Sequence, residues 1–400
     1  MRILYVYKDY YPVLGGIENH VKMLAEGLTR RGCQVQVLVT NTSPQTVIEE
    51  INSVPVIKAG CPFRISGAPL SPALYVWLRR LKPDIAHLHF PNPPGELGQL
   101  FFGRSKRFVL TYHSDIVRQK YLLQVYRPFL WRVLSRADAI TVSNPRYIET
   151  SPYLRPFANK CTVIHHGQDL SRFANPNPDH VAATRNTQHA TRNTQHTSRP
   201  LLLFVGRLRY YKGLEVLIEA MRDIEQAHLL IVGDGPMRQE WEALTMELAL
   251  TQRVTFVGHV PDTELPAYYQ ACDVFVLPST HHSETWGAVQ VEAMACGKPV
   301  VCTELGTGTS YVNRHAETGL VVPPRDSAAL AQAINQLLVD PDLRRRLGER
   351  WRQRAEQEFS KEAMIEETVA LYERLLSNYP HPSPPPPAGE GDGGNSHDLP

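Results

Sequence analysis

Short runs of β-branched and aromatic residues recur along this chain, and a helical stretch follows most of them. The predicted strands cover 2–7, 34–40, 55–58, 84–90, 108–112, 139–142 and 161–164 in the first half, and 201–206, 227–233, 254–257, 273–277, 299–303 and 318–322 in the second. Strands that alternate with helices predict parallel, doubly wound sheets of the α/β class. Because such sheets bind ligands beyond the carboxyl ends of their strands, the residues after each run are the first candidates for function.

The chain is long enough for two domains, since 42% of its 400 residues are hydrophobic. We divide it into a first domain at 1–170, a linker at 171–199, a second domain at 200–360, a helix at 361–378 and a disordered tail, rich in Pro and Gly, at 379–400. The linker holds two tandem copies of ATRNTQH, which together cover 183–196. Because the copies are polar and have no hydrophobic face, we interpret them as a disordered and dispensable loop insertion.

The spacing of the cysteines and the hydropathy of the chain indicate the cellular compartment in which the protein is found. The six cysteines have neither metal-site nor redox-motif spacing, which is typical of reduced thiols. No run reaches the roughly 18 apolar residues of a membrane span, and the opening apolar run is too short for a signal peptide. We therefore expect a cytoplasmic protein.

The net charge of +2 conceals a difference between the two halves. Residues 1–170 hold 21 Lys and Arg against 11 Asp and Glu, a balance of +10, and the remainder balances at −8. A basic domain attracts anionic lipid headgroups or nucleic acid, and a dipole without any partner is the alternative. The stretch at 117–137 interleaves arginines with aromatic residues, as a helix on a membrane surface would, although an amphipathic helix packed on the first sheet has the same pattern.

Two glutamates, Glu284 and Glu292, stand eight positions apart. The sequence predicts a strand at 273–277, a polar loop at 279–285 and a helix at 287–295, so that Glu284 precedes the helix and Glu292 lies on its second turn. The helix is apolar on nearly every side, and a carboxylate buried there needs a partner. Either Glu292 pairs with an Arg or Lys, or it accepts hydrogen bonds from the hydroxyl groups of a ligand.

The candidates of the first domain are a glycine pair and a histidine. Gly15 and Gly16 stand between the first strand and the next helix, where they allow a ligand phosphate to approach, although such a pair is also common in turns. His113 stands at the carboxyl end of a strand, where active-site groups are placed. His87 and His89 share one face of their strand, and without an evident third metal ligand we expect them to pack or to line a cleft.

Two cations, Arg207 and Lys212, follow the strand at 201–206. Such a pair suits a diphosphate because it neutralises two negative charges without a metal, whereas solvated surface cations have the same pattern. The next strand runs into the segment from Gly233 to Pro236, which matches a dinucleotide fingerprint up to the third glycine, where Arg238 stands. We therefore exclude a nicotinamide or flavin site.

Together these motifs resemble glycosyltransferase family 4, the retaining, metal-independent enzymes of GT-B fold, which implies two Rossmann-like domains facing a central cleft. The resemblance covers 1–377 apart from the repeat. The motifs that carry it are Gly15-Gly16-Ile17-Glu18, Thr111-Tyr112-His113, Gly206-Arg207 with Lys212-Gly213, Gly233-Asp234-Gly235-Pro236, and Glu284 and Glu292 within ETWGAVQVEAMACGKPVV. Two positions depart from it, since Trp286 stands where the family commonly has phenylalanine and Cys33 where it often has histidine.

The resemblance implies how the diphosphate is held. Gly16 would contact the donor phosphate from the first domain, while Arg207 and Lys212 would hold the diphosphate and stabilise the departing nucleotide. The acceptor would attack the same face that the diphosphate leaves, with a diphosphate oxygen taking the proton. No cofactor, metal ion or protein base is then required.

The resemblance also implies how the ribose and the sugar are held. Glu292 would bind the ribose hydroxyls, and Glu284, with the amides near Trp286 and Gly287, the sugar hydroxyls. His113 would lie beside the anomeric carbon. The helix at 361–376 would cross back onto the first domain, as it does in the family.

The stretch YHSDIVRQ at 112–119 is similar to bacterial enzymes that build surface polysaccharides, several of them mannosyltransferases. This resemblance implies transfer of a hexosyl group, of the mannose or glucose type, from a GDP- or UDP-linked sugar to a lipid-linked or polysaccharide acceptor. With the basic first domain, it predicts a peripheral position on the inner face of the plasma membrane and no nucleic-acid partner. The alternatives are a nucleotide-sugar epimerase or sugar phosphorylase on the same fold, and an inactive donor-binding subunit.

Overall fold

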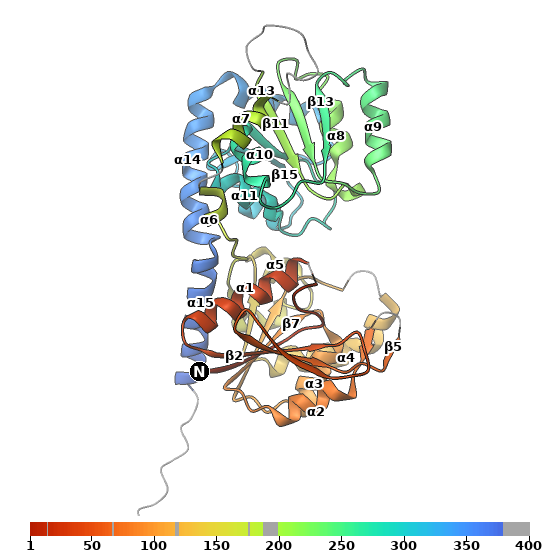
Figure 1. Ribbon diagram of the computed structural model, residues 1–400, viewed down its shortest axis with the longest axis vertical. Helices are drawn as coiled ribbons and strands as arrows, with labels where there is room; N and C mark the ends of the chain where they lie inside the picture. Colours follow the sequence, from red (N-terminus) through yellow and green to blue (C-terminus); the bar gives the residue numbers. More distant parts are fainter. Residues whose placement is uncertain (14, 66–67, 117–119, 175–176, 187–198, 379–400) are drawn as a thin grey trace, which may run out of the picture.

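The computed structural model describes residues 1–13, 15–65, 68–116, 120–174, 177–186 and 199–378. This part of the chain forms two doubly wound α/β domains, one above the other along the long axis of the molecule (Figure 1). The predicted fold class is therefore confirmed. The proposed tail at 379–400 and most of the ATRNTQH repeat lie outside the described residues.

The sheet of the first domain has the order β10-β9-β8-β7-β1-β2-β4-β3 and is parallel except at β3. Its strands are β1 (Arg2–Val6), β2 (Gln34–Thr40), β3 (Val47–Ile51), β4 (Val54–Ala59), β7 (Ile85–Phe90), β8 (Arg107–Tyr112), β9 (Ala139–Val142) and β10 (Cys161–Val163). A separate antiparallel ribbon joins β5 (Phe63–Ile65) to β6 (Ala68–Leu70). The sequence analysis missed β3, β5 and β6.

Helices cover both faces of this sheet. Because successive side chains of a strand point to opposite faces, a strand can pack against helices on both sides. The helices are α1 (Gly16–Arg30), α2 (Pro72–Arg80), α3 (Pro93–Phe102), α4 (Lys120–Arg136) and α5 (Arg146–Thr150). In β1, Ile3 and Tyr5 pack with α1, whereas Leu4 and Val6 pack with α2 and α4. The described part of 117–137 is thus a helix packed on the first sheet, as the second interpretation predicted, and it buries Tyr126.

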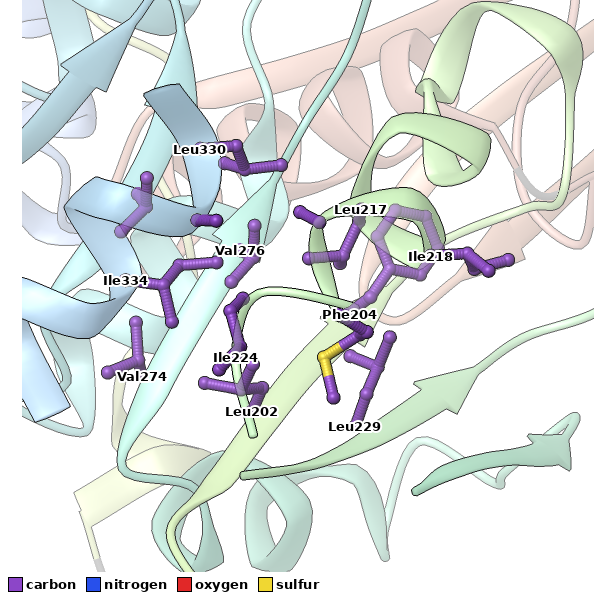
Figure 2. Packing of buried hydrophobic residues seen from close by; sticks show 14 of the residues in the cluster. Leu202, Phe204, Leu217, Ile218, Ile224, Leu229, Val274, Val276, Leu330 and Ile334 are labelled. Atoms are coloured by element: carbon purple, nitrogen blue, oxygen red, sulfur yellow. The ribbon is translucent and has the colours of Figure 1, made fainter. Parts of the chain in front are cut away.

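The second domain has a six-stranded parallel sheet of order β13-β12-β11-β14-β15-β16. Its strands are β11 (Leu201–Val205), β12 (His228–Val232), β13 (Val254–Gly258), β14 (Val274–Leu277), β15 (Val300–Thr303) and β16 (Gly319–Val322). Its helices are α8 (Leu214–Ala220), α9 (Arg238–Glu247), α10 (Leu265–Ala271), α11 (Ala288–Ala295), α12 (Gly308–Val312), α13 (Ser327–Val339) and α14 (Pro341–Glu358). On one face Phe204 of β11 lies beside Leu217 of α8 and Leu229 of β12, in a cluster that also includes Val276 of β14 and Leu330 of α13 (Figure 2).

The linker contains two short helices, α6 (Ser171–Ala174) and α7 (Pro178–Asn186). The prediction that the repeat is a loop from its first residue is wrong, because its first four residues end α7. Thr184 is buried there, and Arg185 pairs with Asp273 at 3.4 Å. The polar composition gave no sign of this helix, which packs against α10 of the second domain.

Two deletions test this correction. Removing 183–196 should lower the free energy of unfolding by about 1 kcal/mol more than removing 187–196, because only the longer deletion removes the last turn of α7 with Thr184 and Arg185. Urea unfolding of both variants measures the difference. Equal stability of the two would show that this turn contributes nothing to the fold.

The chain crosses between the domains twice, and the crossings lie side by side. The amide of Gln168 donates to the carbonyl of Phe359 at 2.8 Å, and the amide of Lys361 donates to the carbonyl of Gln168 at 2.9 Å. After the second crossing, α15 (Lys361–Ser377) packs on the first domain next to α1, where the hydroxyls of Tyr372 and Tyr5 are 2.9 Å apart. Figure 1 shows α14 and α15 following each other along one side of both domains.

Candidate functional site

A cavity of 590 Å³ lies between the domains, beyond the carboxyl ends of β1 and β8 of the first domain and at the start of α11 of the second. We call it the interdomain cavity. It is lined by Tyr7, Lys8, Gly16, Ile17, Glu18, Asn19, His20, Met23, His113, Ser114, His166, Gly167, Gln168, Thr285, Trp286, Ala288 and Glu292. Four residues predicted from the sequence are among them: Gly16, His113, Trp286 and Glu292.

Gly16 opens α1 at the wall of the cavity. A Cβ built on Gly16 would have no atom within 4 Å, so the space beside its backbone is open. The preceding residue, Gly15, is extended and gives no side-chain cap to the helix. Uncapped amides at a helix N-terminus attract anions, so this wall suits a phosphate group.

His113 follows β8, and its side chain is 7% exposed. Its Nε2 lies 3.0 Å from Nδ1 of His89. Burial, with a smaller contribution from His166, holds the pKa of His113 well below the ordinary value of a histidine. At neutral pH the imidazole at the cavity wall is therefore uncharged, which suits a group that contacts a neutral sugar.

Glu292 and Trp286 come from the second domain. One carboxylate oxygen of Glu292 accepts a hydrogen bond from the Tyr269 hydroxyl at 2.7 Å, and the other lies 3.5 Å from the Arg172 guanidinium. Burial raises the pKa of Glu292, and the Tyr269 hydrogen bond opposes this shift. Glu292 thus has an Arg partner at 3.5 Å, as the first interpretation predicted, and it also lines the cavity, while its contact with ligand hydroxyls stays a prediction.

Trp286 brings an unused hydrogen-bond donor. Its indole Nε1 is buried and has no partner among the described residues. A buried donor left unpaired costs about 1–3 kcal/mol. Because this atom has no accessible surface, a ligand oxygen in the interdomain cavity would remove that cost only after a shift of the indole ring.

Lys212 and Glu284 form an ion pair beside this cavity but do not line it. Their Nζ and Oε2 atoms are 2.6 Å apart, and their side chains are 9% and 10% exposed. Ser279 donates to the same carboxylate oxygen at 3.1 Å. The sequence placed these groups at two strand ends, and the structure joins them directly.

The glycines around this pair permit close approach. A Cβ on Gly206 would lie 3.5 Å from the Lys212 ammonium. Gly287, the residue before α11, has a φ of 71°. A Cβ there would lie 2.8 Å from the Leu277 side chain, so Gly287 is required by both its backbone conformation and its surroundings.

Arg207 is exposed, and it lines no cavity described for these residues. The segment from Gly233 to Pro236 lies against the loop that carries it, since the amide of Leu208 donates to the carbonyl of Asp234 at 3.0 Å. A Cβ on Gly233 would come within 2.1 Å of the Gly206 carbonyl. These glycines therefore let two strand-end loops touch.

A second cavity of 380 Å³ adjoins the first, and Ser114 and Thr285 line both. Its other lining residues are Asp115, Asn144, Arg146, Tyr147, Thr150, His282, Gly306, Thr307 and Gly308. The two cavities therefore adjoin in one cleft.

Two cavity histidines were missed by the sequence analysis. His166 follows β10 at a carboxyl strand end, the position that singled out His113, so the same rule would have found it. His20 lies inside α1, four residues after Gly16. The sequence could not show that this turn of α1 faces the cavity.

Comparisons with known proteins agree with this architecture. The model of the family Glycosyl transferases group 1 matches residues 186–354, and that of Glycosyltransferase Family 4 matches residues 14–172. The chain is 34% identical over 381 residues to O-antigen chain mannosyltransferase C of Escherichia coli, covering 94% of this chain and 100% of that protein. It is 35% identical over 351 residues to D-rhamnosyltransferase WbpZ of Pseudomonas aeruginosa, covering 87% of this chain and 89% of that protein.

Solved structures share the fold. Sucrose-phosphate synthase from Thermosynechococcus elongatus has a TM-score of 0.73 and 27% identity, over 94% of this chain and 99% of its own. HepE of Anabaena in complex with UDP has a TM-score of 0.73 and 20% identity, over 94% of this chain and 100% of its own.

Proposed function

Because this chain belongs to the glycosyltransferases of the family 4 and group 1 type, we propose that it transfers a hexosyl group of the mannose or glucose type from a nucleotide-diphosphate sugar, with retention of configuration. The acceptor is a hydroxyl group of a lipid-linked or polysaccharide molecule. The observation that carries the proposal is the interdomain cavity, with Gly16 and His113 on one wall and Trp286 and Glu292 on the other. The names of the O-antigen mannosyltransferase and the rhamnosyltransferase support transfer of a sugar to a surface glycan.

We propose one orientation for the donor in this cleft. Its diphosphate lies at the α1 N-terminus next to Gly16, its ribose hydroxyls meet Glu292, and its sugar lies beside His113. The diphosphate replaces Glu284 as the partner of Lys212, which frees the Glu284 carboxylate to accept hydrogen bonds from the sugar hydroxyls. The acceptor enters through the adjoining cavity and attacks on the face that the diphosphate leaves. Lys212 then neutralises the departing diphosphate, so we propose that transfer needs no metal ion.

Ligand binding and product analysis test this function. A nucleotide at about a hundred times its dissociation constant adds about 2.7 kcal/mol to stability, so thermal-shift measurements with GDP, UDP and ADP and their sugars identify the donor. Product analysis, with EDTA present, then follows transfer to acceptor. Turnover of donor without acceptor would instead indicate an epimerase, and a requirement for inorganic phosphate would indicate a phosphorylase. Donor binding without any turnover would indicate an inactive subunit.

Replacing Trp286 with phenylalanine isolates its indole N–H. The ring remains, so we expect the dissociation constant of the nucleotide sugar to rise about tenfold through the loss of one hydrogen bond. Isothermal titration calorimetry measures this change. Trp351→Phe is the matched control, because its Nε1 is also buried without a partner among the described residues but lies away from the cavity. Equal affinities in the two variants would rule out the indole contact.

We further propose that the first domain docks on anionic membranes. Among the described residues, no helix is long and apolar enough to cross a bilayer. Phe101, Val125 and Phe129 are 61%, 70% and 37% exposed, and the rings of Phe101 and Phe129 are 6.4 Å apart. Arg127 and Arg132 are exposed on the same helix, α4. Apolar side chains flanked by cations suit the headgroup region of an anionic bilayer.

Flotation with vesicles of anionic lipid tests this docking. At low salt we expect the protein to float with the vesicles, and Arg127→Glu with Arg132→Glu to abolish most of the binding, because each cation near such a surface contributes about 1 kcal/mol. The matched control places the same charge change on exposed α14 residues of the second domain, Arg346→Glu with Arg350→Glu. Equal loss in both pairs would mean that net charge, and not this surface, drives binding.

A further inference from the structure

Five histidines meet beside the interdomain cavity, and three of them, His20, His113 and His166, line it. The rings of His87, His89, His113 and His166 form a column, in which successive centroids are 4.8, 5.3 and 5.2 Å apart. The ring of His20 stands nearly perpendicular to this column, 5.4 Å from His89 and 5.3 Å from His113. These side chains come from α1, β7 and the loops after β8 and β10.

Hydrogen bonds within this group do not satisfy all of its nitrogens. Nδ1 of His89 pairs with Nε2 of His113, and Nδ1 of His166 lies 3.1 Å from Nδ1 of His20. A neutral imidazole has one N–H and one lone pair, so each contact uses one of each. Nε2 of His89 is buried and has no partner among the described residues. In one tautomer it is a bare lone pair, and in the other an N–H without an acceptor.

At one end of the column, both ring nitrogens of His87 already have hydrogen-bond partners. Its Nδ1 contacts the Tyr372 hydroxyl and its Nε2 lies 2.6 Å from the Thr111 hydroxyl. The expectation that His87 packs is therefore confirmed. His89 differs from His87, because His20 of α1 and His113 lie beside it and could hold a metal together with it.

Three of the rings can converge on one ion. One ligand nitrogen from each of His20, His89 and His113 lies within 4.8 Å of the other two. With bonds of about 2.0–2.1 Å in a tetrahedral site, ligand nitrogens stand roughly 3.4 Å apart, a change that small side-chain rotations supply. All three rings are buried, which disfavours their charged forms and leaves lone pairs for a metal. Imidazole nitrogens select zinc-type ions over Mg²⁺ and Ca²⁺, which prefer oxygen.

We propose that His20, His89 and His113 bind a divalent transition-metal ion such as Zn²⁺, and that the bound ion inhibits the enzyme. His20 and His113 line the interdomain cavity, so a fourth coordination position opens toward the ligand. The ion takes the lone pair of His113 and places positive charge where a sugar that loses its diphosphate also becomes positive. The inhibition rests on the proposed function, whereas metal binding does not.

Metal binding is tested on the full chain with Co²⁺ and Zn²⁺. We expect one Co²⁺ per chain, with the visible absorption of a tetrahedral nitrogen site, displaced by Zn²⁺. His89→Phe keeps the ring column, and we expect it to weaken binding at least about tenfold. His20→Ala removes a second ligand, so the test stands if one variant does not fold. His281→Ala, on an exposed loop, should keep full affinity.

Two results would overturn the site: no Co²⁺ absorption in the wild-type protein, or unchanged affinity in both ligand variants. For inhibition, we expect equimolar Zn²⁺ to remove most sugar transfer by the wild-type protein and EDTA to restore it. His89→Phe should transfer sugar at the same rate with and without Zn²⁺. Metal binding without loss of transfer would refute the inhibition alone. A wild-type protein that transfers no sugar would refute the proposed function, while the absorption still decides the site.

Discussion

Lys212→Ala is expected to lower kcat/KM for sugar transfer by about 100- to 1,000-fold, as the loss of a group that stabilises developing charge does. In the proposed mechanism Lys212 is the buried cation nearest to the departing diphosphate, and at 9% exposure solvent barely screens it. Steady-state kinetics with the donor identified by thermal shift measures the effect. Near-normal turnover would refute the role.

A control separates this effect from damage to the fold. Lys212→Ala leaves the Glu284 carboxylate buried without its cation, which destabilises the native state. The double variant Lys212→Ala with Glu284→Gln removes both charges, so it should recover stability without recovering activity. Arg207→Ala is the comparison for the second predicted cation. Because Arg207 is exposed, we expect a smaller loss than for Lys212.

Phe204→Ala should lower the free energy of unfolding by about 3–5 kcal/mol, since it removes a fully buried ring from the centre of the second domain. Its neighbours include Leu217 and Ile218 of α8 and Leu229 of β12, and these packed elements cannot all move to fill the space (Figure 2). Because the free energy of unfolding of a domain is typically about 5–15 kcal/mol, this loss would remove a large part of it.

Urea unfolding measures the loss. Phe204→Leu keeps most of the volume and should cost clearly less. Met246→Ala is the surface control, because that side chain is 63% exposed. If all three variants unfold at the same urea concentration, the packing around Phe204 contributes little.

Much of the fold followed from local patterns, because buried parallel strands are continuous apolar runs. The predictions for β2 and β9 match to the residue. The edge strand β3 was missed because its sequence, VIEEI, is mostly solvent-exposed and carries two glutamates. The helix α7 was missed because its polar residues contact another element rather than show a hydrophobic face of their own.

The sequence predicted where the candidate site residues stand along the strands, but not which of their side chains touch. Strand ends marked His113, Lys212 and the loop of Glu284, since topology brings such ends together. That Lys212 and Glu284 touch depends on loop conformations that periodicity does not encode. The approach of His20 to His89 likewise depends on the angle at which α1 crosses the sheet.

The side-by-side crossings give the molecule a mechanical property. Because both backbone groups of Gln168 are hydrogen-bonded to the second crossing, the two crossings form one joint, and we expect bending between the domains to be concentrated there. A Cβ on Gly167 would lie 2.8 Å from the Cα of Lys361, so the joint has no room for a thicker residue. Gly167 and Gln168 also line the interdomain cavity. A ligand in the cavity would therefore contact the segment that joins the two domains, so we expect its binding to affect the angle between them.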